Sequence, residues 1–597
     1  MKFFRFLLTT AVLSLPAVCL RAELIPASRL TSWTPGVSVG VTGGIPTNRN
    51  TLIDVTKSPY NADKTGANDC TSAISSAIDA AVAFNDGHVV YLPAGTYKMT
   101  GGITKSGKNN FTIRGAGDTT VINASGSANT FVLGWSTDWG GGVAITNGLT
   151  AGSTVLTLAN VTGLTVGQQL RIDEQLDLTR PILDTNHDLS TWRVHAQTVR
   201  ITNVNTGANQ VTISRGLLWT LQSGLSPQAH PMAYNVVATG IGIEDLKIDS
   251  VGSTASFTIW LEDVTQSWVK NVHFVNSYNY ELYVLACSNF EVRHCYFDHL
   301  NGSGPSHSHL IVEQTSDSLI EDNIFYQAST HFMLNYGCSG NVFAANFMED
   351  TTIGGGFGQS ININHGAHNS YNLIEGNISC MVEDDGYFGG SSEQTIYRNW
   401  LHGVSPGATR GGLDSEPPLH MKRFGRNHNI VGNILGMTGK QYKAFDSTSP
   451  YSSYYILGYP NIGNDEYSGT ASLINSAPWA DWAAYVAGTY TGGTGGFQEI
   501  DLDVAATATI KGNYNYKDAQ IPASETLSGQ TLANSLYRTS KPAFFGSLTW
   551  PAFDPTNVGT PSYDQIPAGY RYVHGIEPPG VGTTQPPANA RTEIQAR

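Results

Sequence analysis

The sequence predicts an all-β protein built as a parallel β-helix, a solenoid of short strands stacked coil upon coil. The main observation is a strand pattern that returns between Ile243 and Asn433 at intervals of about 22 to 34 residues. Its copies read IEDLKI, VKNVHF, VRHCYF, IEDNIF, FAANFM, IEGNIS, IYRNWL and IVGNIL, and IKGNYN follows at Ile510. One unit cannot bury its own apolar face, so neighbouring units must stack about 4.8 Å apart.

The fourth position of this pattern is the second observation, because asparagine dominates it. The position reads Leu246, Val272, Cys295, Asn323, Asn346, Asn377, Asn399, Asn433 and, in the last copy, Asn513. A stacked Asn side chain can hydrogen-bond the Asn or the backbone of the next coil, which satisfies turn groups inside a solenoid. Leucine-rich repeats also carry an Asn column, but they need a regular Leu pattern that this sequence lacks. The column therefore favours a parallel β-helix.

Composition excludes several other classes of protein. The 597 residues are 10% aromatic and only 13% charged, with a formal net charge of -14. Low charge with many aromatics argues against a disordered chain. An acidic protein also disfavours a nucleic-acid partner or an anionic membrane surface.

The first residues have the organisation of a secretory signal peptide. Lys2 and Arg5 precede an apolar run from Phe6 to Val18, and small residues lead to a cleavage point between Cys19 and Glu23. The run is shorter than the ~20 residues that span a bilayer. We therefore predict that residues 1–22 are removed, that the chain has no membrane span, and that the protein is secreted, periplasmic or on the cell surface.

The remaining cysteines are predicted to be small core residues. They are Cys70, Cys287, Cys295, Cys338 and Cys380. An odd number in an exported chain leaves at least one thiol free. No CxxC spacing indicates zinc, and three of the five fall in strand-like positions, which favours buried thiols over disulfides.

Residues 23–144 are predicted to form an amino-terminal cap and the first coils. Thr71 can cap a helix whose apolar face carries Ile74, Ala77, Ile78 and Ala81, and HVVYLPAGTY then indicates a strand with a Pro-Ala-Gly turn. We expect this helix to cover the open end of the solenoid, because an exposed first coil is an aggregation edge.

The later segments are predicted in chain order. Residues 145–220 alternate apolar and polar positions between Gly/Asn turns, which indicates a small antiparallel β-insert that either shields the solenoid or binds sugar. Residues 221–439 form the main β-helix. An aromatic excursion (440–505), the last coil with a carboxy-terminal wrap (506–578) and a tail of disordered composition (579–597) follow.

The run from Asn61 through Asp69 and Thr71 to LPAGTY resembles the amino-terminal signature of a known superfamily. It is similar to the pectate-lyase-like, polygalacturonase-related right-handed parallel β-helices. The resemblance implies a right-handed coil and a carbohydrate partner. It does not imply one reaction, since the family includes lyases, hydrolases, epimerases and phage tail spikes. The NTD, DD and GHG pattern of polygalacturonases has no match here, so the likeness to that branch is limited to the fold.

The strands that precede the Asn turns give a second alignment. It predicts an inward column of Trp260, Val284, Val312, Leu334, Ile363, Tyr387 and Met421, with neighbouring residues facing outward. The outward face changes from apolar to polar along the solenoid, as a surface that binds a long sugar chain requires. We predict substrate contacts from Glu313, His309, His331, Asn335, Asn364, Phe388 and Arg426.

The acidic residues on this face suggest a choice between mechanisms. A hydrolase needs two carboxyls about 5 to 9.5 Å apart, whereas Glu313 and Asp384 are predicted three coils, about 14 Å, apart. Glu383, Asp384 and Asp385 are predicted one coil from Lys422 and Arg423. This acid cluster can hold Ca²⁺ or bind substrate hydroxyls; its alternatives are a solvated turn and a structural salt bridge to the basic pair.

Abstraction of the proton α to a uronate carboxyl needs a base and a cation that neutralises the carboxyl. We predict Lys422 as the base, with Arg423 binding the acid, and His365 of the HGAH stretch as a second base. The arrangement is similar to sites of β-helical pectate and alginate lyases. The sequence thus predicts a secreted lyase that cleaves an acidic polysaccharide by β-elimination. The alternatives are a glycoside hydrolase and a non-catalytic carbohydrate-binding or adhesion solenoid.

Overall fold

The computed structural model describes residues 24–134, 139–175, 193–232, 237–302, 307–351, 359–384, 390–404, 417–422, 424–438, 454–459 and 501–576. The predicted signal peptide, most of the predicted excursion and the predicted tail lie outside the described residues, as do Asp385, Phe388 and Arg423. Among the described helices, none combines the length and the apolar character needed to cross a bilayer.

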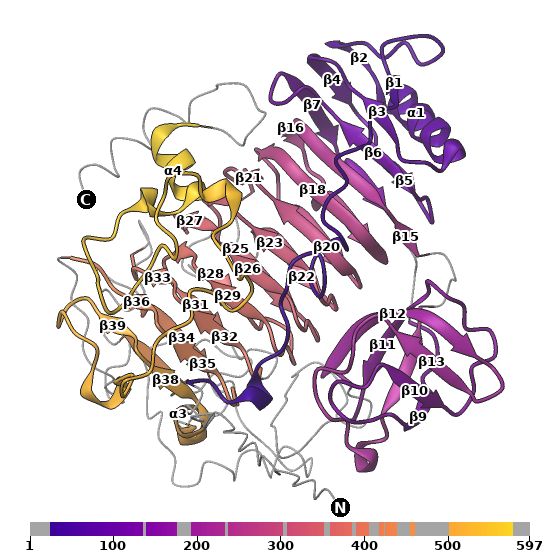
Figure 1. The fold of residues 1–597 in the computed structure, drawn as a ribbon. Coiled ribbons are helices and arrows are strands. Elements are labelled where there is room, and N and C mark those ends of the chain that lie inside the picture. The colour runs from indigo at the N-terminus through magenta and orange to yellow at the C-terminus, as the bar shows by residue number, and fades with distance from the viewer. Residues whose placement is uncertain are drawn as a thin grey trace, which may run out of the picture.

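Each coil of the solenoid contributes three parallel strands, which gives the solenoid three sides (Figure 1). In one coil these are β22 (Ser308–Glu313), β23 (Leu319–Glu321) and β24 (Ile324–Tyr326), and β25 (Thr330–Asn335) begins the next coil. We call the three sides A, B and C in that order. Side A is a ten-stranded sheet, while sides B and C belong to one 23-stranded sheet. The predicted parallel β-helix is therefore confirmed.

Side A consists of β5 (Ile103–Lys105), β8 (Phe131–Leu133), β17 (Phe257–Glu262), β19 (Tyr280–Leu285), β22, β25, β28 (Gln359–Asn362), β31 (Val382–Asp384), β34 (Leu419–Lys422) and β37 (Tyr455–Tyr459). Side B continues through β20 (Ser288–Arg293), β23, β26 (Val342–Ala344), β29 (Leu373–Glu375), β32 (Thr395–Tyr397), β35 (Asn429–Val431) and β38 (Thr509–Lys511). Side C continues through β21 (Tyr296–Phe297), β24, β27 (Phe347–Glu349), β30 (Ile378–Ser379), β33 (Trp400–Leu401), β36 (Ile434–Leu435) and β39 (Tyr514–Asn515).

The first coils hold the remaining strands of the large sheet. These are β1 (Leu52–Asp54), β2 (Thr65–Asp69), β3 (His88–Tyr91), β4 (Gly95–Met99), β6 (Phe111–Arg114), β7 (Thr120–Gly126), β15 (Ala238–Thr239), β16 (Ile241–Ser253) and β18 (Val264–Val275). The capping helix α1 (Thr71–Phe84) packs on β3 and buries Ile74, Ala77, Ile78 and Ala81, as predicted. Its N-cap residue is Cys70; the Thr71 hydroxyl donates to the Asp69 carboxylate at 2.7 Å.

The predicted asparagine column forms a buried ladder at the turn between sides B and C. Asn323 Nδ2 donates to the Val292 carbonyl at 3.1 Å and to Asn346 Oδ1 in the next coil at 2.9 Å. The same contacts run on to Asn513, whose Nδ2 donates to Glu525 Oε2 at 3.0 Å. Each side-chain amide thus satisfies a backbone carbonyl and a backbone N–H of the preceding coil and also donates to the asparagine of the next coil.

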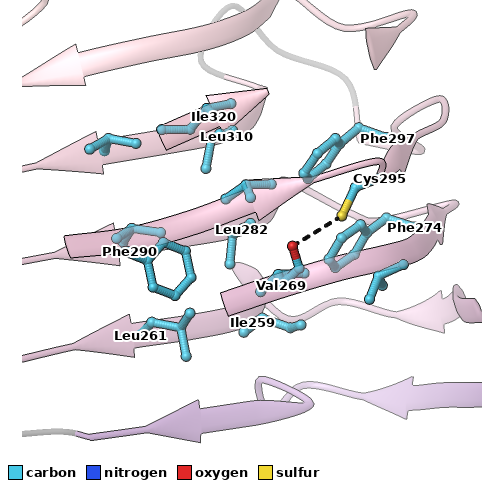
Figure 2. Packing of buried hydrophobic residues seen from close by; sticks show 14 of the residues in the cluster. Ile259, Leu261, Val269, Phe274, Leu282, Phe290, Cys295, Phe297, Leu310 and Ile320 are labelled. Carbon is cyan, nitrogen blue, oxygen red and sulfur yellow. Dashed lines mark hydrogen bonds between the residues drawn. The ribbon is translucent and has the colours of Figure 1, made fainter. Parts of the chain in front are cut away.

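Apolar side chains from all three sides fill the interior (Figure 2). The rings of Phe274, Phe297 and Phe325 stack along side C, with centroids 4.9 and 4.6 Å apart. Beside them the Cys295 thiol donates to the Val269 carbonyl at 3.6 Å. The five cysteines after residue 23 are buried thiols outside any disulfide, which confirms their prediction as core residues.

The predicted β-insert is a closed antiparallel barrel (Figure 1). Its strands are β9 (Val143–Asn147), β10 (Val155–Leu158), β11 (Gln169–Asp173), β12 (Ala196–Asn205), β13 (Gln210–Ile213) and β14 (Gln228–Pro231). Leu156, Leu170, Ile172, Val199 and Val211 fill it. Closure leaves no free edge in the small sheet.

The barrel docks on the turns between sides A and B, where a serine recurs from coil to coil. Ser288 Oγ donates to Gln169 Oε1 at 2.6 Å, and Ser316 Oγ accepts the Thr198 N–H at 2.9 Å. Gln169 Nε2 also donates to Asp263 Oδ1 at 2.7 Å. Burial raises the pKa of this Asp263 carboxyl to about 8. The barrel is therefore held beside the ends of the side A strands.

Sides B and C are covered by the two ends of the described chain. Trp33 in the amino-terminal segment donates to the Tyr371 carbonyl at 3.0 Å and packs on side B. The carboxy-terminal wrap ends in α4 (Pro567–His574), where Arg571 binds Asp322 at 2.7 Å. This wrap packs on side C, which confirms the prediction. Side A is thus the side on which a ligand can be sought.

Candidate functional site

Strand register defines the residues that share the outer face of side A. One outward row contains Trp260, Tyr283, Ile311, Met333, Asn362, Glu383 and His420. Val284, Val312 and Leu334 face inward, as predicted. The residue that aligns with Val284 is Leu261, however, so the predicted inward position of Trp260 is wrong by one residue. Because Ile259, Trp260 and Leu261 are all apolar, the sequence does not show which of them face the interior.

The predicted metal ligands do not share one face. Glu383 pairs with His420 on the outside, whereas Asp384 pairs with Met421 and faces the interior. There Asp384 Oδ2 accepts the Ser391 hydroxyl at 2.8 Å and lies 3.5 Å from His428 Nε2. Because the two carboxylates lie on opposite faces of β31, they do not fit one Ca²⁺ ion. In the described part of the chain, no group of three His, Cys, Asp or Glu residues is arranged to hold a metal.

Glu383 binds the predicted base. Lys422 Nζ lies 2.7 Å from Glu383 Oε1, and His420 Nδ1 lies 3.3 Å from the same oxygen. All three side chains are buried, with at most 3% of the side chain exposed. The predicted base is therefore one member of a buried ion pair. Of the alternatives that the sequence left open, the structure contains the salt bridge.

Two other predicted residues, Arg426 and Asn364, lie away from an accessible outer face. Arg426 binds Asp501 Oδ2 at 2.7 Å, next to helix α3 (Leu502–Thr507). Asn364 is buried, and its Oδ1 accepts the Asn369 backbone N–H at 3.4 Å. Both residues stabilise turns between sides A and B, where the sequence alignment could not resolve side-chain direction.

His309 and His331 are fully buried, contrary to their prediction as substrate contacts. Their rings stack with centroids 5.7 Å apart, and each Nε2 donates to a backbone carbonyl, of Tyr326 and Asp350 respectively. His309 Nδ1 lies 2.6 Å from Glu281 Oε2. Burial lowers the pKa of His331 to about 4 and that of His309 well below its usual value, while it raises the pKa of Glu281. The stack is a neutral structural ladder.

The accessible functional groups gather around Glu313 instead. Its Oε2 accepts the Tyr283 hydroxyl at 2.8 Å, and Asn335 is its neighbour in the next coil. Burial raises the pKa of the Glu313 carboxyl, and the hydrogen bonds from Tyr283 and Asn335 and the charges of Arg171 and His365 oppose that rise. Glu313, Tyr283, Arg171 and His365 are all partly exposed. We call Glu313, Tyr283, Asn335, Arg171 and His365 together the Glu313 cluster.

The barrel contributes directly to this cluster. Arg171 lies on β11, and its Nη1 donates to Gln314 Oε1 at 3.4 Å while Nη2 donates to the Arg193 carbonyl at 2.6 Å. Trp139 Nε1 donates to the same Gln314 oxygen at 2.5 Å. The barrel therefore brings a guanidinium to the edge of side A, and the segment just before it brings an indole. No sequence pattern predicted this contact, because Arg171 and Gln314 belong to different units of the fold.

Sequence reasoning also missed a patch of partly exposed aromatic rings beside the cluster. Phe257 packs against Trp260, Tyr280 and Tyr283 with centroids 5.0, 5.1 and 4.8 Å apart. Glu262 lies at the end of β17, two coils from Glu313 in the same row. Strict alternation along FTIWLE would have placed both Trp260 and Glu262 outward.

Residues 54–280 match the family model described as rhamnogalacturonase A/epimerase, pectate lyase-like. No curated protein matches the sequence. Similar solved structures include the tailspike protein gp49 of Pseudomonas phage LKA1, at 14% identity over 64% of this chain and 74% of that one, with a TM-score of 0.42. The A-module of the mannuronan C-5 epimerase AlgE4 of Azotobacter vinelandii has 14% identity, coverage of 69% and 94%, and a TM-score of 0.34.

A third similar structure is PfbA, a surface adhesin of Streptococcus pneumoniae, at 13% identity over 64% of this chain and 86% of that one, with a TM-score of 0.37. The family match starts at β1 and ends at β19, and the same stacking of three-strand coils continues from there to β39. Over residues 54–280, less than half of its length, the chain is thus similar to this pectate-lyase-like family, and its own parallel β-helix fold continues from there to β39.

Proposed function

We propose that this protein is a secreted, polysaccharide-active enzyme that cleaves an acidic, uronate-containing chain by β-elimination at the Glu313 cluster. One observation carries the proposal. An acid, a base and a cation, namely Glu313, His365 and Arg171, come together on a partly exposed part of side A. The family match supports a carbohydrate substrate, although fold-level analogy alone is weak evidence for a reaction.

Each group has a role in the elimination. Arg171 neutralises the uronate carboxylate, which makes the α proton more acidic. His365 accepts that proton, the C–H electron pair becomes the new C=C bond, and the bond to the glycosidic oxygen on the β carbon breaks. Glu313 gives its proton to the leaving oxygen, a role that suits a carboxyl whose pKa burial has raised.

The aromatic patch supplies a surface for the neighbouring sugars. Trp260, Tyr280 and Tyr283 expose ring faces or edges one and two coils before Glu313. Aromatic side chains offer a large apolar contact with a polar tip, which suits the apolar face of a sugar ring. The substrate is then expected to extend along the solenoid axis from this patch past Glu313.

Hydrolysis is the second candidate, because Glu262 and Glu313 occupy the same outward row two coils apart. That separation is about 9.6 Å between backbones at ~4.8 Å per coil. It is just above the range of about 6.5–9.5 Å for the two carboxyls of inverting glycosidases, and the side chains can close that small difference. A hydrolase would use Glu313 as acid and Glu262 as the base that activates water.

The test is incubation of the purified protein with a panel of acidic polysaccharides, followed by near-ultraviolet absorbance and by reducing-sugar release. Elimination creates an unsaturated product that absorbs, so both signals should rise together. His365→Ala is expected to abolish both. Lys422→Met is the matched comparison, and it should retain turnover if the buried Lys422 ion pair is structural.

Other outcomes would reject parts of the proposal. Reducing ends without absorbance, lost in Glu262→Gln, would establish hydrolysis instead. If Lys422→Met loses turnover while His365→Ala keeps it, Lys422 and not His365 is the base. EDTA tests the predicted calcium and is expected to leave activity unchanged, because Glu383 and Asp384 face opposite sides of β31. If no polysaccharide of the panel gives absorbance or reducing ends but the protein still binds saccharide, the protein is a non-catalytic carbohydrate-binding solenoid.

A further inference from the structure

A cavity lies where the barrel meets the solenoid, and none of the five residues of the Glu313 cluster lines it. Three segments far apart in the sequence enclose it: the amino-terminal segment, the barrel, and the turns between sides A and B. Its volume is about 400 Å³, within the range of about 300–1,000 Å³ that is typical of small-ligand pockets. The residues that matter to the argument are Arg29, Glu174, His195, Trp219, Tyr371 and Glu393.

The walls are built from buried polar and aromatic side chains. The rings of His195 and Trp219 stack with centroids 3.7 Å apart, and Tyr371 lies parallel to Trp219 at 6.4 Å. His195 Nε2 is 3.2 Å from Ser370 Oγ of the solenoid. The barrel wall and the solenoid wall are therefore fixed to one another through these rings.

Carboxylates and a guanidinium line the remaining wall. Glu174 Oε2 accepts the Gln222 N–H at 2.6 Å. Asn427 links Glu393 and Arg29: its Nδ2 donates to Glu393 Oε1 at 2.9 Å, and its Oδ1 accepts from Arg29 Nη2 at 3.1 Å. Two carboxylates against one guanidinium give a lining with more acid than base. An anionic ligand is disfavoured in such a site.

One donor of the wall has no partner within the described chain. Trp219 is 6% exposed, and its indole Nε1 makes no hydrogen bond with any described residue. A buried N–H without a partner costs free energy, so a ligand group or a water is expected to accept from it. The combination of an unpaired donor, carboxylate acceptors and aromatic rings matches a ligand that has hydroxyls and an apolar face.

We propose that this cavity is a second carbohydrate site, which binds a neutral mono- or disaccharide unit at the junction of the barrel and the solenoid. The hydroxyls of such a ligand accept from Trp219 Nε1 and donate to the carboxylates of Glu174 and Glu393. The site is independent of the Glu313 cluster. It gives the barrel a function beyond its contribution of Arg171: the barrel holds a neutral part of a glycan while side A acts on an acidic part.

The proposal is tested by calorimetric titration and ligand-observed NMR with a panel of neutral and acidic probes: glucose, galactose, rhamnose and a neutral disaccharide, against glucuronate and galacturonate. At least one neutral probe should bind, and its acidic counterpart should bind more weakly. Trp219→Phe removes the donor but keeps a ring, and binding is expected to weaken about tenfold. Trp550→Phe, on the carboxy-terminal wrap, is the matched control and should bind as the original protein does.

A second variant distinguishes loss of binding from loss of folding. Ala151→Phe places a large ring at an exposed position of the lining and should abolish binding while the melting temperature stays unchanged. The His365→Ala variant should bind the neutral probe normally, which separates this site from the proposed catalysis. Failure of every neutral probe to bind, tighter binding of acidic probes, or unchanged binding in both Trp219→Phe and Ala151→Phe would overturn the proposal.

Discussion

The Tyr283 hydroxyl sets the acidity of Glu313 through one hydrogen bond of 2.8 Å. That bond stabilises the ionised carboxyl and so opposes the rise in pKa caused by burial. If Glu313 is the acid of the reaction, activity falls as the pH rises through its pKa in the free enzyme. The hydroxyl of Tyr283 therefore tunes the alkaline limit of the reaction.

We predict that Tyr283→Phe moves the alkaline limb of the kcat/KM profile to higher pH. The substitution removes a hydrogen bond to the charged form, so the pKa of Glu313 rises further. Tyr280→Phe is the control, because Tyr280 lies in the same aromatic patch and no hydrogen bond joins it to Glu313 among the described contacts. An unchanged limb in Tyr283→Phe, or the same shift in both variants, would exclude Glu313 as the acid.

Some side chains could be placed from the sequence and others could not. Glu313 and Asn335 were predicted side by side on the outer face of side A, and the strand register pairs them there, because their strands follow one another with a short connection. Asp384 was misplaced because β31 begins three residues earlier than the alignment assumed. Since side chains alternate along a strand, an odd shift moves every residue to the opposite face.

The asparagine ladder illustrates how one repeated position can specify an element. Asn377 Nδ2 donates to the Phe343 carbonyl and to Asn399 Oδ1, and its own Oδ1 accepts from Asn346. All of these groups are buried. A pattern that repeats in the chain and is satisfied only by stacking predicts the stacked structure from the sequence alone.

We predict that Asn377→Ala destabilises the protein by about 3 kcal/mol or more. The substitution strands a carbonyl, an amide side chain and a backbone N–H in the interior, and each unsatisfied buried group costs about 1–3 kcal/mol. Urea unfolding of Asn377→Ala beside Asn48→Ala, which changes an exposed asparagine, measures the difference. Equal midpoints for both variants would show that the ladder does not stabilise the solenoid.

The barrel shows the limit of prediction for elements. Its alternating strands and turns predicted a small antiparallel unit, and the structure confirms one. Its closure and its docking could not be foreseen, because they depend on contacts such as Gln169 with Asp263 and Thr198 with Ser316, which join residues far apart in the sequence. Arg171 reaches Glu313 only through that docking.

The molecule as a whole contains buried histidines whose pKa values are shifted in opposite directions. The pKa of His331 is lowered to about 4 by burial. That of His273 is raised to about 9, because its hydrogen bonds and charge interactions with Asp118 and Asp298 outweigh its burial. The stability linked to His331 is present above the unfolded pKa of about 6.5 and is lost as the pH falls through 4. The stability linked to His273 is present below pH ~6.5 and is lost as the pH rises through 9.

We predict that acidification from pH 7 to pH 4 destabilises the native state, with about 3 kcal/mol of the loss due to His331. His331→Gln removes the titrating ring and should reduce the loss by that amount. His574→Gln changes an exposed histidine of α4 and should not reduce it. Denaturant unfolding at several pH values measures both variants, and identical slopes with pH for His331→Gln and the original protein would refute the prediction.

Glu525 ends the asparagine ladder by accepting from Asn513. Each interior asparagine of the ladder donates to the next in the same way, so a coil duplicated or deleted between Asn346 and Asn433 leaves the hydrogen bonds of the ladder unchanged in kind. Gene duplication could therefore lengthen or shorten side A in steps of about 4.8 Å. The length of the outer face of side A can therefore change in whole coils while the fold stays the same.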